Sequence, residues 1–270
     1  MSKESNAYIV TFAVIMIVVI AATLGFAKEF LKDSQKQAVE LDTQKQILSA
    51  IVPLTDISKS KKEAPTAQEV NTYYAKHIES IAVDVNGDEK KMNQDGEQIV
   101  PEKVSIRKEF KKKDKAEKIL PVFKFKDDAG KVTAYILPVY GNGLWDNIWG
   151  YIALEPDMKT VKGAVFDHKG ETPGLGARIA DDDIESRYAG KTIYNDEGEL
   201  GIEMIKGEGN VEPGSLPKYK VDGMSGATIT GRGVNDMLKN YFTLYENYMQ
   251  KVKKTTSSNS TSLENIALVK

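Results

Sequence analysis

The sequence predicts an α+β protein in which a single N-terminal transmembrane helix precedes a soluble domain with an antiparallel sheet backed by helices. Three observations lead to this prediction: an uncharged apolar segment near the N-terminus, strand-like runs separated by turn signals, and an apolar repeat at helical spacing near the C-terminus. The expected organisation is an N-terminal flank (1–6), a transmembrane helix (7–27), a juxtamembrane helix and linker (28–66), the soluble domain (67–254), and a polar, disordered tail (255–270).

The transmembrane prediction depends on the segment from Ala7 to Ala27, which carries no charged residue. At about 1.5 Å per helical residue it extends for roughly 30 Å, which is the thickness of the hydrocarbon core of a bilayer. A cleaved signal peptide is the competing interpretation, but its apolar region is only about 7–15 residues long. We therefore expect a retained anchor in contact with membrane lipid.

The strands of the soluble domain are predicted from apolar runs bounded by turn residues. Two runs, Leu120 to Phe125 and Val132 to Tyr140, flank Asp127-Asp128-Ala129-Gly130, which is a hairpin signal. Asp84-Val85-Asn86-Gly87-Asp88 has its glycine at the fourth position, whereas a calcium loop needs it at the sixth, so a turn is expected there. Further expected elements are strands at 148–154 and 161–166, a short helix at 175–180 and extended pieces at 192–194, 202–205 and 219–221.

A long helix is predicted near the C-terminus. Apolar residues recur there at the spacing of one helical face. They are Val234, Met237, Leu238, Tyr241, Tyr245 and Tyr248. We expect this helix to begin near Thr230 or Gly231.

Composition excludes several classes of function. Lys and Arg together number 37 and Asp and Glu 39, a balance that gives no reason to expect a nucleic acid partner. The basic run 107–118 is interleaved with acidic residues and predicts a solvated, charged helix or loop. With no Cys and only two His, the chain lacks the ligands of a Cys-ligated iron–sulfur cluster or a structural zinc site. Redox chemistry in this chain would therefore need an organic cofactor.

The segment from Asp222 to Thr230, Asp-Gly-Met-Ser-Gly-Ala-Thr-Ile-Thr, places three hydroxyls and two glycines at the expected start of the long helix. Unpaired N–H groups and the helix dipole favour an anion at such a position, so a phosphate could bind or be attached there. Ordinary helix capping is the alternative. A serine hydrolase is disfavoured, because the nucleophile elbow needs a glycine where Ala227 stands.

This segment resembles the flavinylation motif of the FMN-binding domain family, found in two membrane redox complexes. These are Nqr, the sodium-translocating NADH:quinone reductase, and Rnf, which passes electrons between ferredoxin and NAD. Two more segments are similar to the family's motifs: Gly141-Asn142-Gly143-Leu144-Trp145 and Glu171-Thr172-Pro173-Gly174-Leu175-Gly176. The resemblance covers roughly residues 1 to 250, and the chain length and the Trp145 segment favour the Nqr branch.

The resemblance implies one FMN, joined covalently by a phosphoester to Thr228. Ser225, Gly226, Ala227 and Thr230 are expected near the phosphate, and Asp222 is expected to order the turn or to be recognised by the flavin transferase. The ring is expected to lie on an apolar surface next to glycines that allow close backbone approach. The candidates for this ring site are Leu144, Trp145, Glu171, Thr172, Gly174, Leu175 and Gly176. A core position is equally expected for Trp145, Trp149 is assigned to the core, and His168 is expected to be structural.

In function, the resemblance implies an electron-transfer subunit of the sodium-translocating NADH:quinone reductase, with no quinone reductase activity of its own. Its expected partners are the membrane and flavin/iron–sulfur subunits of the complex and an exported flavin transferase. The Rnf subunit and a non-redox, membrane-anchored binding module remain alternatives. The positive flank at Lys28, Lys32 and Lys36 predicts a cytoplasmic domain. The resemblance implies a bacterial inner-membrane protein with a periplasmic domain, and we follow it.

Overall fold

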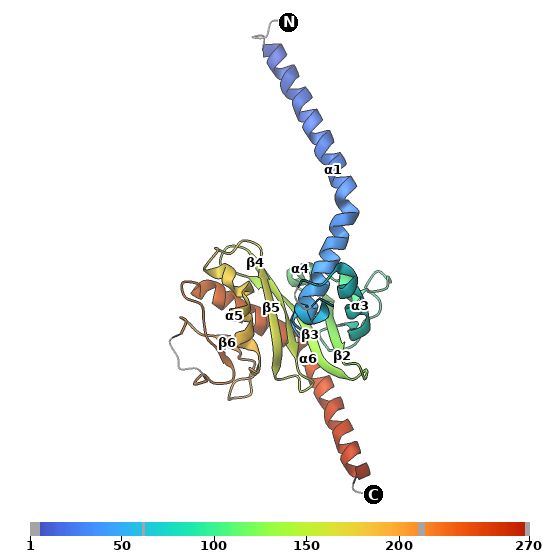
Figure 1. Cartoon of the computed structure of the whole chain (residues 1–270), viewed down its shortest axis with the longest axis vertical. Coiled ribbons are helices and arrows are strands. Elements are labelled where there is room, and N and C mark those ends of the chain that lie inside the picture. The colour runs from blue at the N-terminus through green and yellow to red at the C-terminus, as the bar shows by residue number, and fades with distance from the viewer. Residues whose placement is uncertain (1–5, 61–62, 210–213, 268–270) are drawn as a thin grey trace. The chain divides into compact units, whose positions relative to one another are not determined.

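The computed structural model describes residues 6–60, 63–209 and 214–267, and the chain divides into two compact units. The first unit, up to Gln44, is formed by most of helix α1 (Asn6–Ser49), blue in Figure 1. By length and composition α1 can cross a membrane, and the side chains of its apolar window are exposed. The second unit, from Lys45 onward, is the folded domain.

The folded domain begins earlier than the boundary expected at residue 67. Ile47 and Leu48, at the end of α1, are fully buried. Helix α2 (Leu54–Ile57) follows, and helix α3 (Ala67–His77) starts with a capping box, in which Thr66 and Glu69 each accept a backbone N–H from the other. Residues 45–60 therefore belong to the folded domain and do not form a separate linker.

A five-stranded antiparallel sheet forms the centre of the folded domain (Figure 1). Its strands are β1 (Ile78–Val83), β2 (Leu120–Lys126), β3 (Val132–Asn142), β4 (Asn147–Leu154) and β5 (Val161–His168), and they lie side by side in chain order. Strand β4 pairs with β3 from Leu154 opposite Tyr135 to Asn147 opposite Asn142. The predicted α+β class is confirmed, as are the strands expected for β2 to β5.

Four loops of the domain use the same turn. In the β2–β3 hairpin, Asp127 Oδ1 accepts from the N–H of Lys131 at 2.9 Å, and Gly130 has a φ of +79°. A residue with a side chain rarely adopts this φ, so glycine is needed at the fourth position. The other three turns begin at Asp84, Asn93 and Asn195. The turn expected at Asp84 is therefore confirmed.

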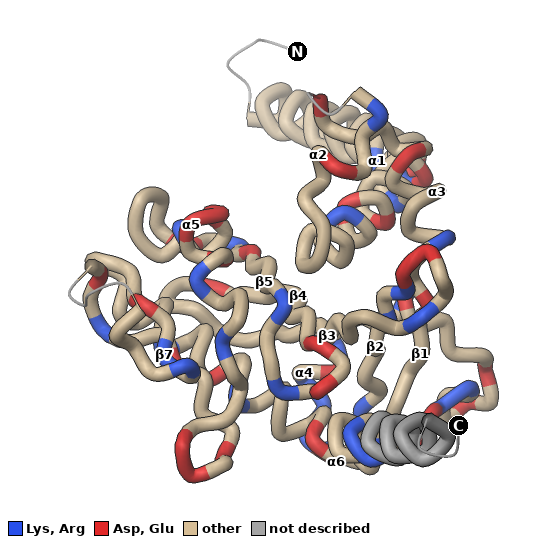
Figure 2. The backbone as a smooth tube through the Cα atoms, turned by 60° about the horizontal axis from the view of Figure 1, so that its bottom comes forward, with Lys and Arg blue, Asp and Glu red and all other residues tan. Residues whose placement is uncertain are grey.

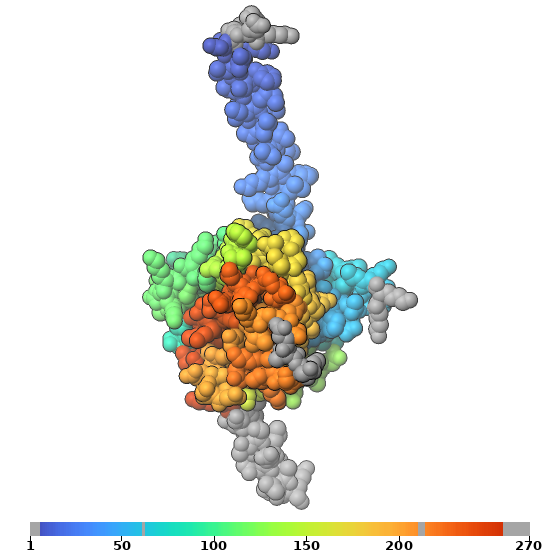
Figure 3. Space-filling model, turned by 90° about the vertical axis from the view of Figure 1, so that its left-hand side faces the viewer, coloured from blue at the N-terminus to red at the C-terminus, as the bar shows by residue number. Residues whose placement is uncertain are grey.

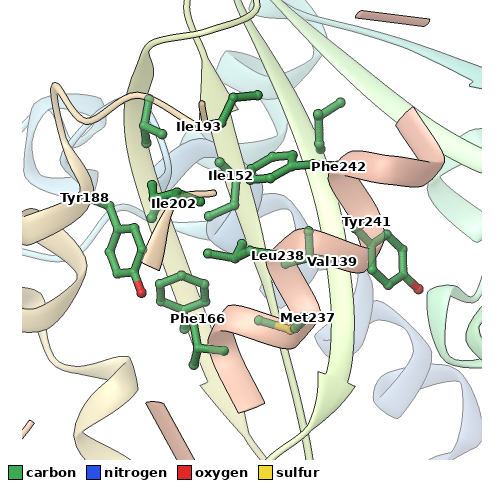
Figure 4. Close-up of a cluster of buried hydrophobic side chains, with 14 of the residues drawn as sticks. Val139, Ile152, Phe166, Tyr188, Ile193, Ile202, Met237, Leu238, Tyr241 and Phe242 are labelled. Carbon is green, nitrogen blue, oxygen red and sulfur yellow. The ribbon is translucent and has the colours of Figure 1, made fainter. Parts of the chain in front are cut away.

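Helix α6 (Thr228–Ala267) packs on one face of the sheet. All six residues predicted for its apolar face are buried. Figure 4 shows Leu238 and Phe242 of this helix among Val139 of β3 and Ile152 of β4. The helix starts at Thr228, two residues before the predicted start, and it continues to Ala267 through the polar segment that was predicted to be disordered.

Short elements complete the domain. Between β1 and β2 lie η1 (Pro101–Lys103), α4 (Ile106–Lys111) and η2 (Lys115–Glu117), and after β5 come η3 (Gly176–Ala180), α5 (Asp182–Glu185) and η4 (Ser186–Tyr188). A parallel pair, β6 (Glu203–Met204) and β7 (Lys220–Val221), precedes α6. The helix expected at 175–180 is confirmed as η3.

Acidic and basic residues are interspersed over the folded domain and do not separate by sign (Figure 2). Two charged residues of the basic run 107–118 are buried and support the fold. The Lys118 ammonium donates to the carbonyl of Lys112 at 2.7 Å, and the Glu109 carboxylate accepts from the N–H of Ile119 at 2.8 Å. The run is therefore partly structural and not wholly solvated.

Candidate functional site

The acceptor loop (residues 222–227) connects β7 to α6. Met224 is buried, whereas Ser225 and Gly226 are exposed. Gly226 has a φ of +71° and turns the chain into the helix, whose first hydrogen bond runs from Gly231 N to Ala227 O at 2.9 Å. Thr228 is therefore the first helical residue, and its partly exposed side chain lies beside N–H groups that have no partner within the helix.

Glu171 joins the three sequence motifs. Its Oε2 accepts from the Thr230 hydroxyl at 2.6 Å, and its Oε1 accepts from the Trp145 N–H at 2.9 Å. Both Glu171 and Thr230 are buried. One carboxylate in the 171–176 loop thus holds the start of α6 and the β3–β4 loop together.

Two glycines make room for this carboxylate. A Cβ on Gly143 would lie 2.4 Å from Glu171 Oε1, and a Cβ on Gly176 would lie 2.6 Å from Glu171 Oε2 and 2.5 Å from Thr230 Oγ1. Real Cβ atoms do not approach other atoms this closely. Gly176 was expected to let the backbone approach the flavin ring closely. It is buried instead, and the absence of a side chain makes space for the Glu171–Thr230 pair.

Four exposed apolar side chains lie on the two loops that Glu171 joins to α6 and at the start of that helix, and we call them the apolar platform. It consists of Leu144, Trp145, Leu175 and Ile229, whose exposed fractions are 43%, 69%, 42% and 54%. Among the described residues of the folded domain, only Met92 and Val100 are other large apolar side chains with comparable exposure. In Figure 3 the yellow-green surface near residue 145, the yellow surface near 175 and the orange surface at the start of α6 meet on one face.

The exposure of Trp145 decides between its two predicted roles. Its indole N–H donates to the Thr172 hydroxyl at 3.1 Å, so the ring has a fixed partner while remaining open to solvent. The core alternative for Trp145 is wrong, whereas Trp149 packs against the core as expected. Ile229 was missed, although an isoleucine between two threonines at a helix start offered a signal.

The remaining predicted residues support the loops around the platform. The Asp222 carboxylate accepts from the N–H groups of Gly223 at 3.1 Å and Gly209 at 3.0 Å, which fits the expected ordering of the turn. Gly174 has a φ of +72°, and a Cβ there would meet no atom within 4 Å. His168 Nδ1 accepts from the Glu171 N–H at 3.3 Å, so His168 helps to place the 171–176 loop.

A cluster of charges beside the acceptor loop was not anticipated. We call it the clamp: Glu208, Arg178, Arg187 and Asp183. Glu208 accepts from both Arg178 Nη1 and Nη2 at 2.8 Å and from Arg187 Nη2 at 2.8 Å, and its Oε2 also accepts from the Ser225 N–H at 3.0 Å. These arginines hold the pKa of the Glu208 carboxyl well below its usual range. Arg178, Asp183 and Arg187 lie on the consecutive short helices η3, α5 and η4, whereas Glu208 lies in the loop after β6, so the contact between them was not visible in the sequence.

The site fits a flavin nucleotide better than a metal ion. A planar aromatic ring needs an apolar surface, and a phosphate needs a helix N-terminus or a nucleophile, and both are present within one surface. Among the described residues no group of three or more His, Asp or Glu is arranged to hold a metal ion. The carboxylates of Asp222 and Glu171 accept hydrogen bonds from protein donors.

Comparison with known proteins agrees with this geometry. A model of the FMN-binding domain family matches residues 143–243, which include all three motifs from Gly143 onward. The C subunit of the Na(+)-translocating NADH-quinone reductase of Haemophilus ducreyi is 32% identical, over 96% of this chain and 98% of that protein. The chain belongs to this C-subunit family.

Crystal structures of two such C subunits have the same fold. The C subunit from Parabacteroides distasonis gives a TM-score of 0.64 at 32% identity, with 81% of this chain and 96% of that chain covered. NqrC from Shewanella oneidensis gives 0.64 at 28% identity, with 80% and 99% covered. The resemblance found in the sequence is therefore confirmed, and it lies with the Nqr branch, as expected.

Proposed function

We propose that this chain carries FMN, bound covalently through a phosphoester to Thr228, and transfers electrons within a sodium-translocating NADH:quinone reductase. The observation that carries the proposal is the placement of a partly exposed threonine at the first residue of α6, the helix start that Glu171 ties to the loops of the exposed apolar platform. Membership of the C-subunit family and the match to the FMN-binding domain model support it.

The geometry favours Thr228 over the second threonine of the motif. Thr230 is only 1% exposed, and its hydroxyl is already donated to Glu171. The side chain of Thr228 is more accessible, and a phosphodiester formed on it would carry its negative charge beside the unpaired N–H groups of the first helical turn. Ser225 is exposed as well, so its variant belongs in the test below.

Attachment requires an activated flavin nucleotide, because hydroxide is a poor leaving group from FMN itself. A flavin dinucleotide meets this need. The Thr228 oxygen forms a bond to the phosphorus of the FMN half, the pyrophosphate P–O bond breaks, a nucleoside monophosphate leaves, and the hydroxyl proton passes to a base of the flavin transferase. The transferase is therefore a partner of this chain.

The ring would lie over the apolar platform, where Trp145 and Leu175 offer flat and branched surfaces. FMN supplies the one- and two-electron chemistry, and the protein fixes its position and tunes its potential. A covalent link prevents loss of the cofactor when its redox state changes. The exposure of the platform allows a partner subunit to approach the ring closely.

In this proposal the chain works with the membrane and flavin/iron–sulfur subunits of the complex. Electrons from NADH reach the FMN through these subunits and pass onward to quinone, while sodium export is coupled elsewhere in the complex. The corresponding role in Rnf is the second candidate. The similar proteins are named as C subunits of the sodium-translocating enzyme, which favours the first.

We further propose that α1 anchors the chain in the bacterial inner membrane with the folded domain on the periplasmic side. The length and apolar character of the helix support the anchor. The periplasmic side follows from the need for the folded domain to meet an exported flavin transferase, although the positive charge of the flanking lysines predicts the cytoplasmic side. Protease treatment of intact spheroplasts should cleave the folded domain if it lies outside, and leave it intact if it lies in the cytoplasm.

Fluorescence on a denaturing gel tests the covalent link. The full chain made together with its flavin transferase should give a fluorescent band under ultraviolet light, and Thr228→Val should abolish it. Thr243→Val is the matched control, because Thr243 is exposed on the same helix and bonds to the carbonyl of Lys239 at 2.8 Å. Loss of the band in Ser225→Ala together with its retention in Thr228→Val would overturn the assignment.

A further inference from the structure

We propose that Glu208 is a positioning residue for the attachment of the flavin: through the clamp, it holds the acceptor loop in the conformation that the flavin transferase modifies. The inference rests on the proposed function and extends it to residues outside the three motifs. Glu208 acts through the backbone of the loop and does not touch the reacting atoms.

Two residues of the clamp form hydrogen bonds to backbone groups of the acceptor loop. Glu208 Oε2 accepts from the Ser225 N–H at 3.0 Å, and Arg187 Nη1 donates to the Gly223 carbonyl at 2.6 Å. Between these points the Met224 side chain is buried in the core. Three consecutive residues of the loop are thus held by polar contacts on one side and by apolar packing on the other.

Thr228 lies between two such fixed points. Ser225, three residues before it, is held by Glu208, and Thr230, two residues after it, is held by Glu171 at 2.6 Å. Gly226 supplies the only left-handed turn between them. Attack on phosphorus needs the hydroxyl oxygen in line with the leaving group, and small displacements reduce the rate strongly. Release of either fixed point should therefore slow the transfer.

The arginines of the clamp are committed to protein carboxylates. Arg178 and Arg187 both donate to Glu208 and to Asp183, and Arg187 Nη1 also lies 3.7 Å from Asp222 Oδ2. Arg178 Nε also lies 3.8 Å from Asp181 Oδ2, so four carboxylates face two guanidinium groups. A flavin phosphate would have to displace one of them, so the structure assigns the clamp to the loop and not to the cofactor.

Removal of the Glu208 carboxylate has a local effect. Arg178 and Arg187 are about one quarter and one fifth exposed, and the two-pronged contact between Arg178 and Glu208 is a geometry that fixes both partners. Without the Glu208 carboxylate, the Ser225 N–H loses its acceptor and the two arginines lose their shared partner. The acceptor loop then samples other conformations while α6 and the sheet remain packed.

The initial rate of flavin transfer tests the inference. The purified full chain in detergent would be incubated with flavin transferase and flavin dinucleotide, and covalent FMN measured by mass spectrometry over time. Glu208→Ala should lower kcat of the transferase at least tenfold, and Glu208→Gln should lie between it and the wild type. Glu203→Ala, which removes an ion pair with Lys220 on the neighbouring β6–β7 pair, is the matched control and should stay within twofold of the wild type.

Two further measurements separate the possible outcomes. Near-ultraviolet circular dichroism establishes that Glu208→Ala is folded at the assay temperature, and if it is not, Arg178→Lys, which retains the charge but loses the two-pronged contact, takes its place. An absence of covalent FMN on the wild-type chain overturns the proposed function. Normal labelling of the wild type with an unchanged kcat in the folded clamp variant overturns only the role of Glu208.

Discussion

The Thr230 hydroxyl donates to Glu171 Oε2 at 2.6 Å inside the protein, two residues after the partly exposed Thr228. The two threonines of one motif thus have different tasks. Thr230 ties the first turn of α6 to the 171–176 loop, while the side chain of Thr228 is partly exposed. Because Glu171 also holds the Trp145 backbone, the same carboxylate aligns the helix start with the apolar platform.

Glu171→Ala should destabilise the folded domain by about 2–4 kcal/mol, because the buried Thr230 hydroxyl loses its acceptor and a cavity remains. Glu171→Gln keeps the shape and one acceptor oxygen, so it should cost about 1 kcal/mol. Thermal denaturation of the full chain in detergent measures both variants. Equal melting temperatures for Glu171→Ala and the wild type would show that the pair does not support the fold.

Gly176→Ala should also destabilise the domain, by about 2 kcal/mol or more, because its Cβ would overlap Glu171 and Thr230. Gly170→Ala is the control in the same loop, since its Cβ would meet only Asp146 Cβ at 3.6 Å. For a domain of this size the difference corresponds to roughly 4–8 °C in melting temperature. A Gly170→Ala variant as unstable as Gly176→Ala would contradict the packing argument.

Trp145→Ala should leave stability within about 0.5 kcal/mol of the wild type, because the side chain is largely exposed. If the ring of the flavin lies against the indole, the same change should raise the flavin fluorescence of the loaded protein, since a stacked indole quenches flavin emission. Trp149→Phe, at a half-buried position on the sheet, is the control. Unchanged emission in Trp145→Ala would remove Trp145 from the ring site.

The sequence was sufficient for the parts of this protein that depend on local pattern. The apolar runs of β2 to β5 and the turn residues between them predicted the sheet, and the helical spacing of residues such as Leu238 and Tyr245 predicted the buried face of α6. The hydrogen-bond partners of the Glu171 carboxylate could not be predicted, because the motif identifies the residue but not the donors that the fold brings to it. The clamp could not be predicted either, because Arg178 and Glu208 are thirty positions apart in the sequence and come into contact only in the folded domain.

Stability should depend on pH through Glu185. Burial, together with the nearby carboxylates of Asp182, Asp167 and Asp181, raises the pKa of Glu185 to about 7, although its Oε1 accepts from the Phe166 N–H at 2.7 Å. The folded state therefore favours the protonated form. The contribution of protonated Glu185 to folding stability is fully present below its pKa in the unfolded chain, near 4.5. This contribution is lost as the pH rises through the folded-state pKa of about 7.

Glu185→Gln removes this dependence. The free energy of unfolding of the variant, compared with that of the wild type, should rise between pH 5 and pH 8 by about 1–2 kcal/mol, a value that allows for the partial exposure of Glu185. Melting temperatures of the two proteins at both pH values provide the measurement, and Asp196→Asn, at an exposed turn, is the control. A difference between variant and wild type that is the same at pH 5 and pH 8 would contradict the raised pKa.

Mass spectrometry of the peptide spanning residues 219–232 tests the central claim most directly. The chain would be isolated from a host that contains the flavin transferase, and its fragments assigned residue by residue. The account predicts the added mass of one esterified FMN, located on Thr228. An unmodified peptide from such a host, or the added mass on Ser225 or Thr230, would contradict it.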